Sequence, residues 1–178
     1  YGVTDWWETE VGMEFADEHD EDFEAKVLVF ENKFQLAPKG ALFVDPGIKI
    51  EYARNLQSGP DELQAKLLLG KQIGKFSNLA NIAVSREVGE DSEDDLEYGF
   101  SYALAYEQAE DFAYGLEWYS GFGTLESGSD SWDEQSHQVG PVAYGEMAEG
   151  LGYEAGVLFG VSDEAPDATI KAVLEYEF

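Results

Sequence analysis

The sequence has no cysteine, few basic residues and no long apolar run. Without cysteine, a disulfide framework, a thiolate zinc site and a cysteine nucleophile are all excluded. The 10 Lys and Arg residues stand against 38 Asp and Glu, which gives a formal net charge of -28. Such a chain repels phosphates, so we expect no nucleic-acid partner. Its uninterrupted apolar stretches all fall short of the roughly 18 residues that suggest a transmembrane helix.

Aromatic residues, in contrast, are abundant: 11 Phe, 10 Tyr and 4 Trp. Disordered acidic chains are poor in aromatics, so the charge does not predict disorder here. A length of 178 residues is typical of one domain, and we predict a single domain over residues 1–178. The sequence begins at Tyr1 rather than Met, from which we expect a processed or truncated start.

The apolar residues recur with a period of two. From Leu96 to Tyr106, every second residue is Leu, Tyr or Phe, and the residues between them are Glu, Gly, Ser and Ala. A helix would scatter the aromatic side chains around its circumference, whereas a strand places them on one face. The same pattern predicts about ten strands, at residues 6–16, 23–36, 41–53, 62–75, 79–88, 96–107, 112–120, 136–147, 152–161 and 168–178.

The connections between these strands alternate in character. Five are long or strongly acidic, at residues 17–22, 54–61, 89–95, 121–135 and 162–167. Four are short, at residues 37–40, 76–78, 108–111 and 148–151. Long connections at one end and tight turns at the other are typical of an up-and-down transmembrane barrel. We therefore predict an all-β, up-and-down antiparallel transmembrane β-barrel of about ten strands.

Each predicted strand has one apolar and one polar face, which fits two kinds of barrel. In a soluble ligand-binding barrel the apolar face would point inward. In a membrane barrel it would face lipid, and the Glu, Gly, Ser and Ala face would line the lumen. Aromatic residues near strand ends favour the membrane barrel, because Trp and Tyr gather at membrane interfaces. The soluble barrel remains an alternative.

The two ends of the sequence carry a resemblance to a known class. The last residues, LEYEF, place Leu174, Tyr176 and Phe178 in alternation and end on Phe. This resembles the closing strand of bacterial outer-membrane β-barrels, in which such an ending is read by the assembly machinery. The opening YGVTD, residues 1–5, resembles a turn found in poorly characterised outer-membrane proteins of porin or transporter type. The resemblance implies an outer-membrane location, lipid and lipopolysaccharide as surroundings, and a strand before Tyr1 that would allow twelve strands.

The inward face of the predicted barrel is rich in carboxylates. The candidates for lining a lumen or ion path are Glu8, Glu10, Glu14, Glu87, Glu97, Glu117, Glu154, Glu175, Glu177, Lys26, Lys49, Lys66 and Lys171. Rings of carboxylates favour cations in a pore, which predicts a narrow porin-like channel for small or cationic solutes. The alternative is a closed barrel, in which Glu and Lys pair across the lumen and the acidic outer loops contact a protein partner or cations.

The acidic loops contain weak candidates for metal ligands, namely Asp20, Glu21, Asp22, Asp91, Asp94 and Asp95. Their spacing does not match a calcium-binding loop, so we expect mainly solvated loop tips and no resident cofactor.

Histidine offers one route to an enzyme. His137 could act as a general base in a lipid-modifying outer-membrane enzyme, but Ser136 beside it would point to the opposite face of a strand. A serine distant in sequence would have to serve, and the signatures of known hydrolases are absent. We therefore predict a protein that is not an enzyme.

Overall fold

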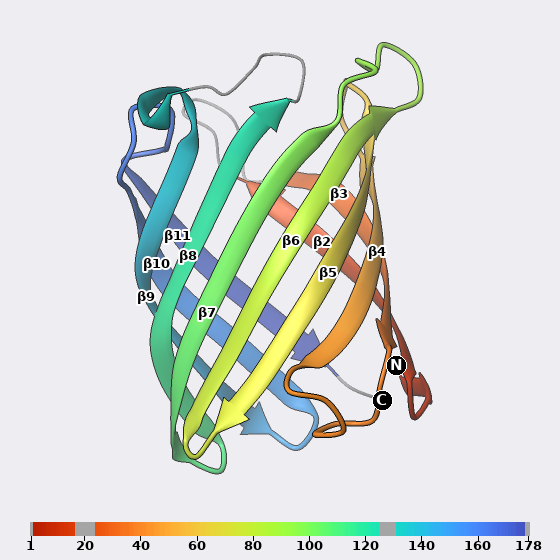
Figure 1. Ribbon diagram of the computed structural model, residues 1–178. Coiled ribbons are helices and arrows are strands. Elements are labelled where there is room, and N and C mark those ends of the chain that lie inside the picture. The colour runs from red at the N-terminus through yellow and green to blue at the C-terminus, as the bar shows by residue number, and fades with distance from the viewer. Residues whose placement is uncertain (1, 17–23, 125–130, 177–178) are drawn as a thin grey trace.

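The computed structural model describes residues 2–16, 24–124 and 131–176, which form one antiparallel sheet (Figure 1). Its strands are β1 (Gly2–Thr4), β2 (Trp7–Ala16), β3 (Glu24–Gln35), β4 (Asp45–Asn55), β5 (Asp61–Ile73), β6 (Phe76–Val88), β7 (Glu97–Ala109), β8 (Phe112–Thr124), β9 (Ser136–Ala148), β10 (Leu151–Gly160) and β11 (Ala168–Tyr176). A single turn of 3-10 helix, η1 (Trp132–Glu134), precedes β9. Among the described residues, no helix is long and apolar enough to cross a membrane.

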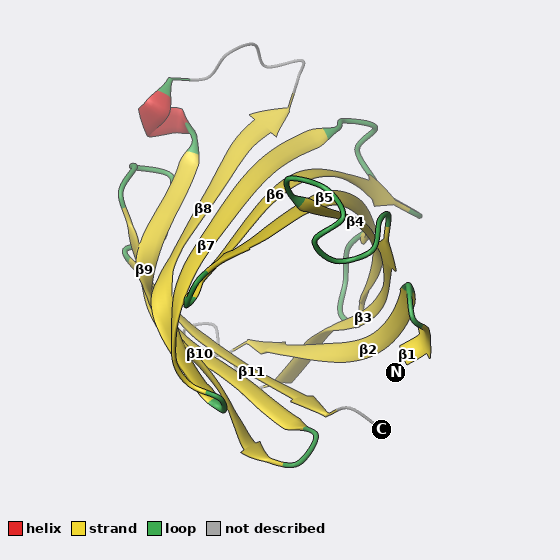
Figure 2. Ribbon diagram, turned by 60° about the horizontal axis from the view of Figure 1, so that its bottom comes forward, coloured by secondary structure: helices red, strands yellow, loops and turns green. Residues whose placement is uncertain are grey.

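The strand order in the sheet follows the order in the chain, from β1 to β11. Every described strand pairs antiparallel with its neighbours in sequence, so the sheet is an up-and-down meander. The sheet curls until β11 and β2 lie on either side of an open seam (Figure 2). Within the described residues, no backbone pairing joins β11 to β1 or β2 across this seam. The sequence therefore predicted the all-β, antiparallel, up-and-down arrangement correctly.

The two ends of the sheet differ in the length of their connections. Residues 74–75, 110–111 and 149–150 form tight turns at one end, which we call the turn end. Residues 56–60, 89–96 and 161–167 connect strands at the opposite end, which we call the loop end (Figure 1). The predicted alternation of long and short connections is confirmed, with an exception between β3 and β4.

That exception is the connection at residues 36–44, which was predicted to be a short turn at 37–40. The chain turns back on itself here, because the Ala41 amide donates to the Pro38 carbonyl and the Gly40 amide donates to the Asp45 carboxylate. Strand β4 therefore begins only at Asp45. A second difference is β1, which was predicted as a turn but pairs Gly2 with Glu8 and Thr4 with Trp7.

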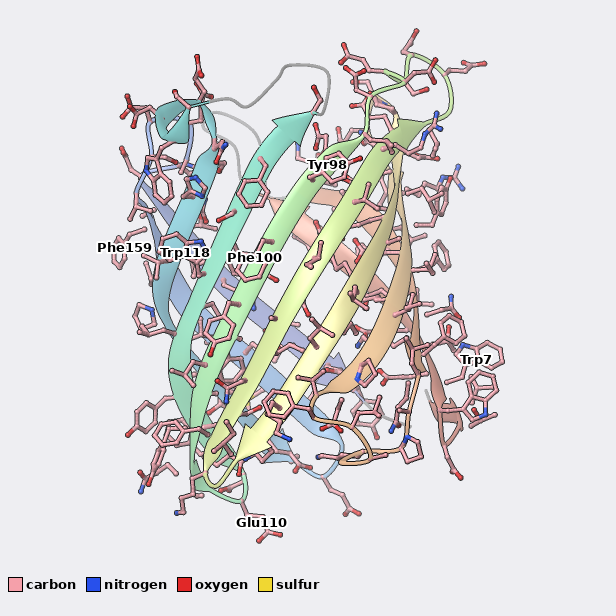
Figure 3. All side chains as sticks on the ribbon, in the orientation of Figure 1. Trp7, Tyr98, Phe100, Glu110, Trp118 and Phe159 are labelled. Carbon is pink, nitrogen blue, oxygen red and sulfur yellow. The ribbon has the colours of Figure 1, made fainter. Side chains whose placement is uncertain are left out.

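The outer face of the curled sheet is apolar. Val11, Leu116 and Ile170 lie within strands, yet their exposed fractions are 66%, 54% and 83%. Figure 3 shows Trp7 and Phe159 projecting away from the sheet. Period-two alternation places Glu10 and Glu117 on the opposite, inner face. The aromatic and aliphatic set therefore faces outward, as the membrane interpretation requires.

Buried apolar residues are correspondingly few. Among the described residues, Val29, Val142 and Leu158 are the buried hydrophobic side chains. A water-soluble protein of this size is stabilised mainly by apolar area removed from water, at about 25 cal/mol per Å². This sheet instead places most of its large apolar side chains outside and its charged side chains inside.

Candidate functional site

A run of ion pairs crosses the inner face of β2, β3, β4 and β5. The Lys33 ammonium lies 3.3 Å from a Glu8 oxygen and 3.0 Å from a Glu10 oxygen. The Lys49 ammonium contacts the carboxylates of Glu31 and Glu51, the latter at 2.7 Å. Lys66 continues the run at 3.7 Å from Glu51. Each Lys is therefore neutralised by a carboxylate on its own or a neighbouring strand.

The sheet register arranges these charges in two rows of opposite sign. Lys33 is the register partner of Lys49, and Lys49 of Lys66, which we call the lysine row. One step along the strands, Glu10 is the partner of Glu31, and Glu31 of Glu51, which we call the glutamate row. Like charges directly opposite one another repel, which is destabilising within each row. The stabilising attraction is between the lysines of one row and the glutamates of the other.

A second group of charges lies on the other half of the inner face. The Lys171 ammonium, from β11, lies 2.9 Å from Glu117 on β8 and 2.7 Å from Glu154 on β10. The hydroxyls of Tyr119 and Tyr144 donate to the two Glu117 oxygens at 2.8 and 2.7 Å. We call these five residues the Lys171 cluster. The Glu117 side chain is only 6% exposed, which makes it the most enclosed of the ion-paired carboxylates described here.

Three carboxylates meet at the seam. Glu8 and Glu10 of β2 and Glu175 of β11 have oxygen atoms within 4.8 Å of one another. Lys33 already contacts Glu8 and Glu10. Beside them lies a cavity of about 820 Å³, lined among others by Lys33, Lys71 and Glu175 at the turn end. A cation passing through this cavity would therefore meet an excess of negative charge.

Apart from Lys26, the predicted lumen residues fall into three groups. Glu8, Glu10, Glu117, Glu154, Glu175, Lys49, Lys66 and Lys171 make the inner-face contacts described above. Glu14, Glu87 and Glu97 share the inner face by strand alternation, but they lie near the loop end. Glu177 lies outside the described residues.

Lys26, also predicted to line the lumen, lies at an irregularity in the pairing of β2 with β3. Glu14 pairs with Val27 and Phe15 pairs with Ala25, so Lys26 is an extra residue in β3 and alternation from Leu28 does not assign its face. A lysine of β3 that does lie on the inner face is Lys33. The sequence analysis missed it, together with Glu31 and Glu51. The signal for Glu31 and Lys33 was that they alternate with Phe30 and so share one face of β3 with Val29.

Of the two acidic loops, only residues 89–96 lie within the part of the chain that the structure describes. Asp20, Glu21 and Asp22 lie outside the described residues. Asp91, Asp94 and Asp95 are described, and Asp94 pairs with Arg86 at 3.1 Å. Across the described part of the chain, the one group of carboxylates with metal-ligand spacing is that of Glu8, Glu10 and Glu175.

The candidate assembly signal lies on the outer face of β11 as far as it can be followed. Leu174 and Tyr176 are exposed beside the seam, and Phe178 lies outside the described residues.

Comparison with known proteins adds no family to these observations. No protein-family model matches the chain, and no curated protein matches it at a significant level.

Proposed function

We propose that the protein is a β-barrel of a bacterial outer membrane that forms a narrow, porin-like channel for small or cationic solutes. The observation that carries this proposal is the reversed polarity of the sheet, with apolar side chains outside and ion pairs inside. An apolar outer face is unfavourable in water and favourable against hydrocarbon. Lipid and lipopolysaccharide are then the partners of this face.

The dimensions and ends of the sheet support the same proposal. Strands β2 to β11 contain between 9 and 13 residues. A tilted strand of about 9 to 11 residues crosses a bilayer. Three tight turns at one end, and acidic connections at residues 89–96 and 161–167 at the other, match the periplasmic and extracellular ends of such barrels. Leu174 and Tyr176, with Phe178 beyond the described residues, would form the signal read by the assembly machinery.

The charges on the inner face suggest which solutes would pass. Glu8, Glu10 and Glu175 gather beside the 820 Å³ cavity, where Lys33 is the cation that contacts two of them. Carboxylates at a narrow passage attract cations and repel anions. We therefore propose the seam carboxylates as the filter of a cation-preferring path.

Conductance in planar lipid bilayers tests this proposal. Wild-type protein should give discrete currents whose reversal potential in a salt gradient indicates cation preference. Glu10→Gln and Glu175→Gln should each shift that potential toward zero, because each removes a negative charge from the passage. Glu110→Gln is the matched control, since Glu110 lies in a turn outside the sheet (Figure 3) and should leave the potential unchanged.

One observation favours a closed barrel as the second candidate. The side chains of Lys49, Glu31 and Glu51 are only 13 to 14% exposed, so the middle of this half of the inner face is tightly occupied. A closed barrel would act as a structural or interaction protein, whose exposed acidic loops contact a partner or cations. Folded protein that inserts into the bilayer but passes no current above the lipid background would exclude the channel and leave this candidate.

A further inference from the structure

Ser120 and His137 form a buried pair on the outer face of the sheet. They are register partners on β8 and β9, and the Ser120 Oγ lies 2.8 Å from the His137 Nδ1. Ser120 is 7% exposed and His137 is 1% exposed. Strand alternation puts Ser120 in phase with Leu116 and Trp118, and opposite in phase to Glu117. The pair is therefore separate from the ionic groups of the inner face.

The hydrogen bonds around the pair determine which nitrogen of the His137 ring carries its proton. The Trp118 indole N–H donates to the Ser120 Oγ at 2.7 Å. On the other side, the His137 Nε2 lies 3.1 Å from the Gln135 Oε1, an oxygen that can only accept. The proton of the neutral imidazole therefore belongs on Nε2, which leaves Nδ1 to accept the Ser120 hydroxyl proton. A hydroxyl that donates to an imidazole held by a third group is the arrangement of an activated nucleophile.

An aromatic lid covers this pair. The Trp132 ring stacks on the His137 ring, with centroids 3.8 Å apart and planes inclined by 23°. The Trp132 side chain is held in place by its indole N–H, which donates to the Val161 carbonyl at 3.1 Å. At the start of η1, the amide of the preceding Ser131 donates to the Glu134 carboxylate at 2.8 Å, and this bond lowers the pKa of Glu134. Trp132 itself is 49% exposed, so the cover is a single ring at the surface.

We propose that Ser120 and His137 are the nucleophile and general base of an ester-hydrolysing site, which opens when the Trp132 ring moves aside. Gln135 is a positioning residue, because it acts through the imidazole. The site lies on the outer face near the loop end, where Phe122 and Trp132 are exposed. For the substrate class the inference rests on the proposed membrane location: the ester linkages of a lipid lie at that level, between headgroup and acyl chain.

The reaction needs only the ester and water. The Ser120 Oγ attacks the carbonyl carbon while its proton passes to Nδ1 of His137. The ester C–O bond then breaks, and the leaving alkoxide takes that proton to become an alcohol. Water attacks the acyl-serine and gives its proton to Nδ1, and the Ser120 oxygen leaves and recovers it. The products are a carboxylic acid and an alcohol, with no change in oxidation state.

Labelling with an alkyl fluorophosphonate tests the proposal directly, since this probe reacts with activated serines. The detergent-folded wild-type protein should be labelled on the peptide that contains Ser120, as identified by mass spectrometry. Ser120→Ala should abolish this labelling. His137→Ala should slow it by about 100-fold, within the range expected for loss of a general base. Trp132→Ala should accelerate it, because the cover is removed.

Ser136→Ala is the matched control, because Ser136 neighbours His137 in sequence but lies on the opposite face. It should be labelled at the wild-type rate. For Gln135, replacement by Ala should slow labelling and replacement by Glu should restore it and shift its pH profile, which a merely structural role would not do. Circular dichroism establishes that each variant is folded.

Two results would overturn the site: folded wild-type and Trp132→Ala proteins that both leave Ser120 unlabelled, or His137→Ala protein labelled as fast as wild type. Labelling does not depend on conductance or on lipid. A protein that is labelled at Ser120 but remains monomeric without detergent would keep the hydrolytic site while removing the membrane proposal. Turnover of a nitrophenyl ester of a fatty acid in mixed micelles, lost in Ser120→Ala, would support the lipid-ester class.

Discussion

Lys171 is surrounded by side chains that also hydrogen-bond to one another. Its ammonium group contacts Glu117, Glu154 and the hydroxyl of Tyr119, which come from β8 and β10. Glu117 in turn accepts from Tyr119 and Tyr144. Removing the cation would leave an enclosed carboxylate with only neutral donors, and a buried charge without its partner is costly.

We expect Lys171→Met to lower the free energy of unfolding by about 3 kcal/mol, as for other broken buried pairs. Lys33→Met is the matched comparison, because Lys33 and two of its partners, Glu8 and Glu10, are 31 to 42% exposed. Its third partner, the enclosed Glu31 at 3.8 Å, would keep its contact with Lys49. That change should cost about 1 kcal/mol or less, as for other exposed pairs. Urea unfolding in detergent, followed by tryptophan fluorescence, measures both.

The double variant Lys171→Met/Glu117→Gln provides the control for this prediction. If the loss comes from an unpaired charge, neutralising Glu117 should recover much of the stability. Equal losses for Lys171→Met and Lys33→Met would mean that the Lys171 cluster is as well solvated as the surroundings of Lys33.

The sequence pattern predicted some of the inner-face residues and missed others. Glu117 and Lys171 were predicted to face inward because their neighbours alternate cleanly with apolar residues. Lys33 was missed because β3 contains the continuous apolar run Val27–Phe30, which hides the phase of its two faces. Pairing between particular residues also depends on register across strands, which a single strand pattern does not contain.

At the scale of strands, two glycines allow the sheet to bend tightly. A Cβ on Gly115 would collide with the carbonyl oxygen of Leu104 on β7, and a Cβ on Gly140 with that of Val157 on β10. These glycines sit where the backbones of neighbouring strands approach most closely. The curl of the β7–β10 region therefore depends on the absence of a side chain at these two positions.

We expect Gly140→Ala to lower the free energy of unfolding by about 1 to 3 kcal/mol, as overpacking commonly does. A methyl group there would have to displace the backbone of β10, since it would also lie 2.8 Å from the Leu158 Cα. Unfolding in urea with a far-ultraviolet signal measures the change.

Gly152→Ala is the control at a position where the nearest atoms would be 3.8 Å away. It should change stability by no more than about 0.5 kcal/mol, as is usual away from such features. A loss at Gly152 equal to that at Gly140 would show that the glycines matter for chain flexibility rather than for close approach.

For the whole molecule, the decisive feature is the direction in which the two faces point. The alternation of apolar and polar residues predicted the strands, their order and the separation of polar and apolar faces, because these features depend on local sequence. It did not predict the open seam between β2 and β11 or the tight approach at Gly115 and Gly140. Those features arise from the curl of the full sheet, which links residues distant in sequence.

If the outer face meets lipid, its tryptophans should be reached by quenchers in acyl chains. In reconstituted vesicles, brominated lipids should quench the fluorescence of the outer-face residues Trp7 and Trp118 more strongly than aqueous iodide does. Replacing Trp118 with Phe should reduce the lipid-quenched signal and supplies the control. A protein that stays monomeric in plain buffer, with its aromatic rings shielded from a water-soluble quencher, would contradict the membrane location.

The lysine and glutamate rows give the interior a polarity along its axis. Lys33 is paired with Glu8 near the start of β2, so the lysine row lies closer to the turn end and the glutamate row closer to the loop end. A cation entering from the loop end would meet the glutamate row before the lysine row, whereas one entering from the turn end would first meet the seam carboxylates Glu8 and Glu175 beside the lysine row. Currents through such a passage should rectify, with a magnitude that depends on the sign of the applied voltage.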